Sequence, residues 1–262
     1  MRATAAQRMP RHLGAKLFVA ALLVFLFAPV VIVVMFSFNS SAELHLAGLS
    51  TRWYQDVFAD PEAMQALKHS AIAAAATAVG ALALGMSAAL ALMRVPQRLR
   101  PIALGLSALP IAVPGLMIAF GLAVLYRQLN FEQSLGLTIS GHVLIALPFV
   151  LLTMSSALDR FSFSMLEAGR DLGASAPRLY WSIVLPILRP AIEGAALLAM
   201  AVSLDEFLIA FFTAGADTTL PMLIWARVVR GVDPSLNALA ALLLIATTAL
   251  ALLAARRTRP RW

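Results

Sequence analysis

The chain has 262 residues, of which 61% are hydrophobic and 13% are charged, and its formal net charge is +7. About a quarter of the residues of a soluble domain are charged, so this composition favours a single membrane domain over residues 1–262. The absence of cysteine excludes disulfides and thiolate metal sites. The basic residues form no face with interleaved aromatic residues, so we expect no nucleic-acid partner.

Six stretches are long and apolar enough to cross the hydrocarbon core of a bilayer, which takes about 20 residues per helix. In chain order they cover residues about 17–38, 69–93, 101–126, 138–158, 187–212 and 236–255. The first is too long for the apolar part of a signal peptide, and no small-residue cleavage pattern follows it, so we expect a retained anchor. The prediction is an all-α integral membrane protein with six transmembrane helices.

The orientation of these helices follows from the lysines and arginines in the short loops. The segments expected outside hold only Arg52, Lys68, Arg127, Arg227 and Arg230. The other 15 of the 20 basic residues lie in the two terminal segments and in the loops after the second and fourth spans. We therefore expect both termini in the cytoplasm.

Two compositional features mark the second, third and fourth spans. The second span is rich in alanine and glycine, which lets helix backbones approach closely in a membrane. The third contains Pro110 and Pro114, and the fourth contains Pro148. Proline frees a backbone carbonyl and bends a helix, so we expect bends at these positions.

The segment that joins the fourth and fifth spans, about residues 165–186, is expected in the cytoplasm and mixes charged residues, glycine, proline and aromatic residues. Its local chemistry predicts two short helices with a turn between them. Gly173 can adopt the positive φ that ends the first helix, whereas Ser175 and Pro177 suit the start of the second. Pro186 then marks the passage into the fifth span.

The second of these short helices has an apolar, aromatic surface made of Leu179, Tyr180 and Trp181. Such a helix either docks into a groove of a partner protein or lies on the lipid headgroups. The local chemistry alone leaves both possibilities open.

This segment resembles the EAA loop of permease subunits of binding-protein-dependent ABC importers. The resemblance rests on Glu167-Ala168-Gly169, then Gly173 after three residues, then Ile183-Val184-Leu185-Pro186 after nine. Gly169 stands where the family has alanine, a small departure that loosens the first helix slightly. The resemblance implies a coupling helix that inserts into the ATP-binding subunit, through Glu167, Ala168, Gly169, Gly173, Ala176, Leu179, Ile183, Leu185 and Pro186.

A second resemblance, to spermidine/putrescine permeases, is densest between residues 167 and 242. It rests on residues 203–207, 211–215, 220–222, 229–234 and 237–239. It implies a short outer helix at about residues 222–229 and an importer of a small solute in the bacterial inner membrane. A polyamine such as spermidine or putrescine is the expected cargo; an aminophosphonate or another amine is the alternative.

The chain has no sequence for binding ATP. A P-loop requires Gly-Lys followed by Ser or Thr, but the only lysines, Lys16 and Lys68, follow alanine and leucine. We therefore expect a transport subunit that is not an enzyme and holds no cofactor. The partners implied by the resemblance are two copies of an ABC ATP-binding subunit, a second homologous permease subunit, a periplasmic solute-binding protein and membrane lipid.

Three acids in the fifth span are costly to bury in a bilayer. Glu193 lies near the cytoplasmic end, and we expect it to pair with Arg189 one turn earlier. Asp205 and Glu206 lie past the midpoint toward the outer face, so they are candidates for the path of a cationic solute. Alternatively, Arg227 or Arg230 of the outer loop, or a partner subunit, satisfies them.

A metal-binding protein, a membrane enzyme and a secondary transporter are each less well supported by the sequence than an importer permease. His12, His45, His69 and His142 are dispersed without metal-ligand spacing, so we expect interfacial or packing roles and no metal site. No catalytic constellation indicates a membrane enzyme. A self-contained secondary transporter or channel that uses Asp205 and Glu206 for ions or protons is a further alternative. Inverted repeats with interrupted helices in both halves would favour it, and no convincing repeat is present.

Overall fold

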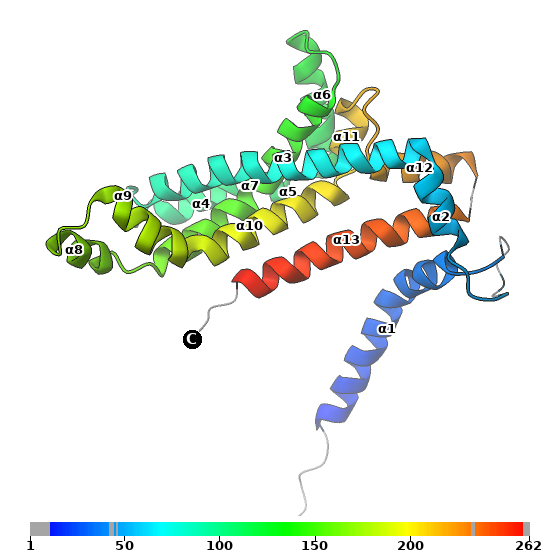
Figure 1. Ribbon diagram of the computed structural model, residues 1–262, viewed down its shortest axis with the longest axis horizontal. Helices are drawn as coiled ribbons and strands as arrows, with labels where there is room; N and C mark the ends of the chain where they lie inside the picture. The colour runs from blue at the N-terminus through cyan, green and yellow to red at the C-terminus, as the bar shows by residue number, and fades with distance from the viewer. Residues whose placement is uncertain (1–10, 42–44, 46, 232–233, 259–262) are drawn as a thin grey trace, which may run out of the picture.

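The computed structural model describes residues 11–41, 45, 47–231 and 234–258, and helices account for most of them (Figure 1). Five of the described helical stretches are long and apolar enough to cross a membrane: Gly14–Ser37, Pro61–Leu92, Leu135–Asp159, Ala176–Asp205 and Ser235–Thr258. The predicted all-α integral membrane class is therefore confirmed. Four basic residues used to predict the orientation, Arg2, Arg8, Arg259 and Arg261, lie outside the described residues.

The body of the molecule consists of four long helices that run along its long axis (Figure 1). They are α3 (Pro61–Leu92), α7 (Leu135–Asp159), α10 (Leu185–Asp205) and α13 (Ser235–Thr258). Helix α10 packs against each of the other three, and α3 and α7 share a further extensive interface. The fifth predicted span thus lies at the centre of the bundle.

Small residues bring α3 and α7 together, as the composition of the second span predicts. A Cβ atom added to Gly85 would lie 2.7 Å from Val150, and one added to Gly80 would lie 2.9 Å from Val143. A real Cβ atom does not lie this close to another side chain, so only glycine fits at these two positions without a shift of the neighbouring helix. Ala81 between them is fully buried. Close backbone approach of this kind drives helix association where lipid replaces water.

Helix α1 (Arg11–Ser37) leans away from this body and contacts only the neighbouring α13 extensively (Figure 1). None of its most apolar 18-residue stretch is buried within the chain. Its exposed apolar side chains are suited to lipid or to another membrane subunit. Near its end, the Ser37 hydroxyl lies 2.7 Å from the Tyr54 hydroxyl, which ties α1 to α2 (Arg52–Ala59).

The third predicted span is not one helix. It consists of α4 (Arg100–Ser107), α5 (Leu109–Ala112) and α6 (Gly115–Gln128). The reason is local, because Pro110 opens α5 and Pro114 precedes α6, and the residue before a proline is pushed out of the helical region. Val113 accordingly has ψ of 133°. Pro148, by contrast, lies inside an uninterrupted α7.

One end of the bundle is closed by α2 and by α12 (Leu220–Arg230). Trp53 of α2 and Leu223 of α12 are buried in an apolar cluster with Ala63 of α3 and Leu239 of α13. The short helix expected at about residues 222–229 is therefore confirmed and is slightly longer. The motif residues Val232 and Asp233 that follow it lie outside the described residues.

Candidate functional site

At the opposite end of the bundle, two short helices form an elbow beyond the ends of the long helices (Figure 1). The elbow comprises α8 (Ser164–Asp171), a turn, and α9 (Ala176–Leu179). The predicted pair of helices in this loop is thus present. Ala176 and Pro177 open α9, and the Ser175 side chain makes no capping hydrogen bond there.

The turn of the elbow depends on Gly173, which has φ of +80°. Its amide donates to the carbonyl of Arg170 at 2.8 Å, and the Ala174 amide donates to the carbonyl of Gly169 at 3.0 Å. These bonds satisfy the last carbonyls of α8, as a left-handed glycine at a helix end commonly does. No atom lies near an added Cβ, so backbone conformation alone favours glycine here.

Gly169, the departure from the family pattern, has a packing role. A Cβ atom at this position would overlap the side chain of Leu179, which is only 5% exposed beneath α8. Glycine therefore lets α8 settle directly on α9 through Leu179. Ile183, the next motif residue, is half-buried against the main core. Leu179 and Ile183 hold the elbow in shape.

The second short helix does not end before the fifth span, which corrects the predicted boundary at Pro186. A π-helical turn, Tyr180–Val184, carries α9 directly into α10. Proline cannot donate a backbone hydrogen bond, so Pro186 disturbs the regular ladder one turn earlier without ending the helix. Leu185 and Pro186 consequently lie in the first turn of α10. The elbow is therefore continuous with the central helix.

The outer surface of the elbow is largely apolar and carries charges of both signs, Glu167 and Asp171 beside Arg170 and Arg178. Leu172 at the turn is 88% exposed and Trp181 is 66% exposed, and Tyr180 stacks edge-on against Trp181 with ring centroids 5.3 Å apart. Glu167 and Ala168 are also exposed on α8. Large apolar side chains displayed at a protruding loop are typical of a surface that binds a partner.

The fifth predicted span is interrupted where its acids lie. Helix α10 ends at Asp205, Glu206 has ψ of 104°, and α11 (Leu208–Thr213) begins shortly afterwards. The Glu206 carboxylate accepts a hydrogen bond from the Ile209 amide at 3.1 Å. Glu206 thus caps α11, where a negative charge complements the free amides of a helix start.

Asp205 differs from its neighbour, because its side chain is exposed and Glu206 is half-buried. The two acids therefore separate into one that stabilises the break and one that remains accessible. The span expected at about residues 187–212 was treated as one continuous helix, and the structure corrects this because α10 ends at Asp205.

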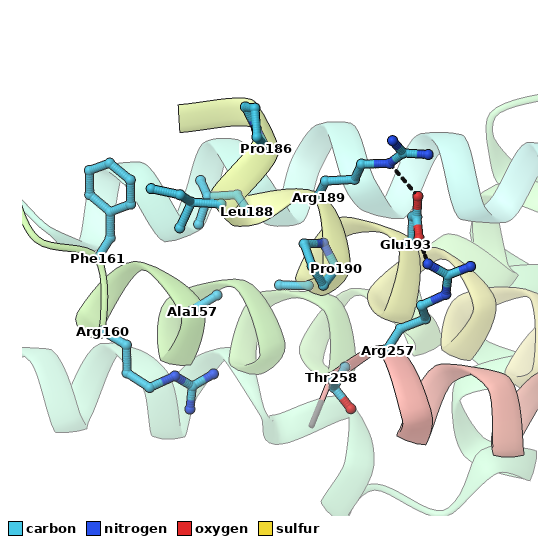
Figure 2. A pocket seen from close by; sticks show the side chains of 12 residues that line it. Ala157, Arg160, Phe161, Pro186, Leu188, Arg189, Pro190, Glu193, Arg257 and Thr258 are labelled. Carbon is cyan, nitrogen blue, oxygen red and sulfur yellow. Dashed lines mark hydrogen bonds and ion pairs between the residues drawn. The ribbon is translucent and has the colours of Figure 1, made fainter. Parts of the chain in front are cut away.

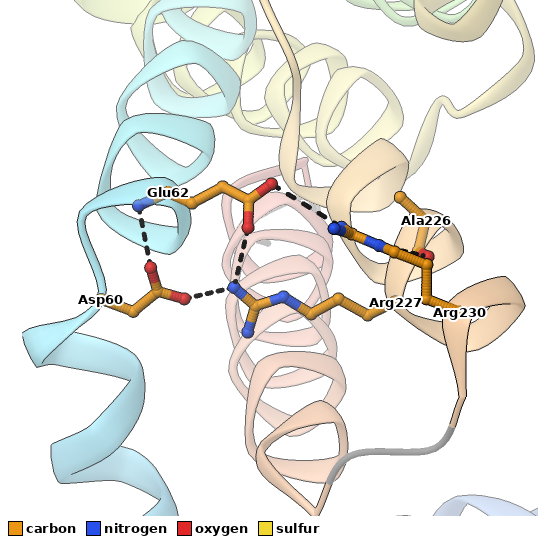
Figure 3. Close-up of polar contacts among 5 residues, drawn as sticks. All are labelled: Asp60, Glu62, Ala226, Arg227 and Arg230. Carbon is orange, nitrogen blue, oxygen red and sulfur yellow. Dashed lines mark hydrogen bonds and ion pairs between the residues drawn. The ribbon is translucent and has the colours of Figure 1, made fainter.

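The arginines offered as alternative partners for these acids lie elsewhere (Figure 3). Arg227 contacts the carboxylate of Asp60 and lies 3.3 Å from Glu62, and Arg230 lies 3.7 Å from the other oxygen of Glu62. The alternative pairing of Asp205 or Glu206 with either arginine is therefore wrong. The physical reason is that α12 packs against the start of α3. The two helices are about 165 residues apart in the sequence, so local sequence reasoning does not identify this contact.

This ionic cluster is partly shielded from water. Burial alone would raise the pKa of Asp60, but hydrogen bonds from Arg227 and from the Glu62 amide outweigh it and hold the pKa below its usual value. Burial likewise opposes the charge of Arg227, yet the bond to Asp60 raises the pKa of the guanidinium. The cluster fastens α12 to the amino end of α3.

The two interrupted spans meet. Gly115, at the start of α6, lies against Leu208 at the start of α11, and a Cβ there would be 3.4 Å from the leucine methyl group. Phe120 of α6 and Phe212 of α11 make an edge-to-face contact with centroids 6.2 Å apart. Discontinuous helices that meet within a membrane protein free backbone groups and commonly line a path for solutes.

Aromatic rings follow Asp205 around this break, a feature that sequence reasoning did not identify as a site. Phe207 lies 5.4 Å from Phe211 and 5.7 Å from Trp225 of α12, measured between ring centroids. Phe211 and Trp225 are each 50% exposed. Exposed ring faces beside a carboxylate can bind an organic cation through cation–π attraction and charge.

Two of the histidines, His142 and His69, pack against other parts of the chain, which is one of the two roles expected of them. His142 is buried between α7 and α10 and lies 2.7 Å from the Ser203 hydroxyl. His69 lies 3.1 Å from the carbonyl of Thr218.

Glu193 pairs with Arg189 at 2.6 Å, as predicted, and additionally with Arg257. Within the described residues no group of side chains suits a metal ion.

The comparison with family models decides the class of protein. The model described as the binding-protein-dependent transport system inner membrane component matches residues 81–261. The chain belongs to this family. It is therefore an ABC importer permease, and its interrupted helices and elbow belong to a multi-pass transport subunit.

Similar permeases extend the comparison over most of the chain. The putrescine transport system permease protein PotI of Escherichia coli (strain K12) is 38% identical over 231 residues, which cover 84% of this chain and 82% of PotI. The spermidine/putrescine transport system permease protein PotC of the same organism is 33% identical and covers 87% of each chain. PotC of Haemophilus influenzae is 32% identical over 96% of this chain and 98% of its own.

Solved structures share the fold at lower sequence identity. A bacterial ABC transporter involved in the import of the acidic polysaccharide alginate aligns with a TM-score of 0.67 over 94% of both chains, at 15% identity. The MetNI methionine ABC transporter aligns with a TM-score of 0.60 over 76% of this chain and 98% of the other, at 16% identity.

Proposed function

We propose that this permease is one of two membrane subunits of an ATP-driven importer in a bacterial inner membrane, and that its cargo is a polyamine such as spermidine or putrescine. The observation that carries the proposal is similarity at 32–38% identity, over most of the chain, to permeases named for these solutes. A second homologous permease subunit would cover part of the apolar surface that α1 leaves exposed.

Energy enters through separate ATP-binding subunits, because no lysine of this sequence lies in a P-loop. The elbow is the docking element in this proposal: Leu172 and Trp181 supply apolar contact, Glu167 supplies charge, and α10 transmits the movement to the centre of the bundle. Continuity of α9 with α10 favours this role, since a rigid connection moves the fifth span when the elbow moves.

Both termini lie in the cytoplasm in this proposal, and the elbow lies on the same side. The described arginines at the elbow end, including Arg160, Arg170, Arg178 and Arg257, accord with the positive-inside rule. The α12 end then faces the periplasmic solute-binding protein. A structural neighbour of this chain is described in complex with an alginate pentasaccharide-bound periplasmic protein.

The cargo passes the break between α10 and α11 in this proposal. Asp205 would attract the ammonium groups of a polyamine, and the exposed faces of Phe211 and Trp225 would hold its positive charges without binding them tightly. Glu206 supports the path by capping α11.

Uptake of labelled putrescine and spermidine, in cells that carry the complete transporter, tests both the docking role of the elbow and the cargo path at the break. We expect Glu167→Ala to reduce uptake of either solute by about tenfold or more, since loss of a central interface contact has effects of this size. Asp205→Asn should reduce uptake at low concentration by about tenfold. Asp56→Asn, an exposed acid on α2 outside both sites, is the matched control.

The outcomes separate function from cargo. Wild-type uptake in both Glu167→Ala and Asp205→Asn would contradict the proposed mechanism. Uptake of an aminophosphonate or another amine in place of polyamines would contradict the cargo and leave the importer class intact.

A second candidate function, a self-contained secondary transporter, is favoured by the two interrupted spans, which such proteins also possess. The two functions differ in what the purified chain does alone. Ion-driven flux of polyamine into liposomes that contain only this chain would favour the secondary transporter, whereas flux that requires the ATP-binding subunits and ATP favours the importer.

A further inference from the structure

A hollow of about 520 Å³ opens between α7, α10 and α13 at the end of the bundle that carries the elbow (Figure 2). Its polar walls are Arg160 directly after α7, Arg189 and Glu193 of α10, and Arg257 of α13. Apolar side chains such as Phe161 and Leu188 form the rest of the wall. Neither the elbow nor the break near Asp205 includes these charged residues.

The hollow has an excess of positive charge among its described residues. Glu193 is the only acid in the wall, and its two oxygens lie 2.6 Å from Arg189 and 2.8 Å from Arg257. Arg160 lies on the other side of Pro190 in Figure 2 and donates only to the Ser156 hydroxyl, at 3.1 Å. The described wall therefore holds three guanidinium groups and one carboxylate, an excess of positive charge that favours an anion in the hollow.

An apolar groove adjoins the charged hollow and shares Arg160 and Thr258 with it. The groove has a volume of about 340 Å³ and is lined on the membrane side mainly by Leu198, Ala251 and Ala255. From Thr258 to Ala251 it follows α13 for about 10 Å, at 1.5 Å per residue. Apart from Arg160, which directly follows α7, these residues belong to helices that are long and apolar enough to span a membrane.

Gly194 explains why a groove of this kind persists beside tightly packed helices. A Cβ atom there would overlap Thr258 and lie 3.2 Å from the Ala254 carbonyl, so α10 and α13 are in direct backbone contact. Small residues at this crossing, including Ala251 and Ala255, leave the space between α13 and α7 unfilled by the chain itself.

We infer that an anionic phospholipid binds here, with its phosphate between Arg160 and the Arg189–Glu193–Arg257 chain and the upper part of one acyl chain in the groove. A basic pocket between transmembrane helices at the membrane surface suits such headgroups. A soluble phosphate could use the arginines alone, and so could an acidic segment of a partner protein. Only a lipid uses the adjoining groove at membrane depth, and this decides the choice.

Lipid binding to the purified complex, followed by native mass spectrometry in the presence of phosphatidylglycerol or phosphatidylcholine, tests the inference. We expect phosphatidylglycerol to bind more tightly, and Arg160→Gln to weaken it about fivefold, the effect of one basic contact at the membrane surface. Phosphatidylcholine binding should be unchanged. Arg98→Gln, an exposed arginine outside the hollow, is the matched control.

The groove is tested separately with Ala251→Phe, which fills it without removing charge. This variant should weaken phosphatidylglycerol binding and leave Arg160 free to bind inorganic phosphate. Equal binding of the two lipids, an equal loss with Arg98→Gln, or displacement of phosphatidylglycerol by millimolar inorganic phosphate would overturn the inference. The inference would also be overturned if the ATP-binding subunit alone, without bound lipid, protected Arg160 from an arginine-modifying reagent. None of these readouts depends on transport.

Discussion

The two ends of the helix bundle are built in opposite ways. At the α12 end, Trp53 and Leu223 are buried and Arg227 is bonded to acids at the start of α3, so contacts within the chain hold these helices together. At the elbow, Leu172 and Trp181 remain exposed and Glu167 is left at the surface. The difference teaches that one end is fastened within the chain, whereas the other presents a surface for something else to cover.

Two leucines give the largest expected contrast in stability. Leu223→Ala should lower the free energy of unfolding by about 3 kcal/mol, because it leaves a cavity in the buried cluster at the α12 end. Leu172→Ala should change it by less than about 0.5 kcal/mol, because that side chain is 88% exposed. Thermal unfolding of the purified variants in detergent measures both. Equal losses would remove the distinction between the two ends.

Two arginines sharpen the account of the α12 end. Arg227→Gln leaves the half-buried Asp60 without its charged partner and should cost about 2 kcal/mol of unfolding free energy. Arg230→Gln removes an exposed ion pair and should cost less than about 1 kcal/mol. Denaturation of the two variants side by side checks the order, and a larger loss for Arg230→Gln would contradict it.

A pair of glycines tests the turn of the elbow. Gly173→Ala forces a residue with a Cβ into a left-handed conformation and should cost about 1 kcal/mol locally. Gly105→Ala replaces a helical glycine with open space around it, so it should be neutral or slightly stabilising. Hydrogen exchange of the elbow amides reports the local effect. Unchanged exchange in Gly173→Ala would mean that the turn tolerates a side chain.

The smallest effect is the pH dependence of the α12 end. The pKa of Asp60 is lowered by folding, so its contribution to stability is present above the pKa of the unfolded chain, about 3.9. That contribution disappears as pH falls through the lower pKa of the folded chain. Wild type should therefore exceed Asp60→Asn in melting temperature near neutral pH and lose the advantage in acid. A difference that persists below both pKa values would contradict the assignment.

Local chemistry predicted much of the elbow. Gly173 indicated the left-handed turn, and Ser175 and Pro177 indicated the start of the second short helix. The continuity of α9 with α10 was missed, because a π-helical turn accommodates Pro186 without ending the helix. Sequence alone does not specify whether a proline ends a helix or is absorbed by it.

The breaks in the membrane helices were harder to predict. Pro110 and Pro114 were interpreted as bends, although the restriction on the residue before a proline favours a full interruption at Val113. No proline or glycine marks the break at Glu206; the only local signal is an acid able to cap the following helix. The partners of Arg227 lie about 165 residues away, so no local rule identifies them.

The central claim is that the elbow binds the ATP-binding subunit, and the absence of native cysteine makes it directly testable. Leu172→Cys in the assembled transporter should crosslink to that subunit through a short bifunctional reagent, whereas Phe58→Cys on α2, an exposed position at the opposite end, should not. A Leu172→Cys variant that reacts only with lipid-soluble probes and never with the ATP-binding subunit would contradict the account.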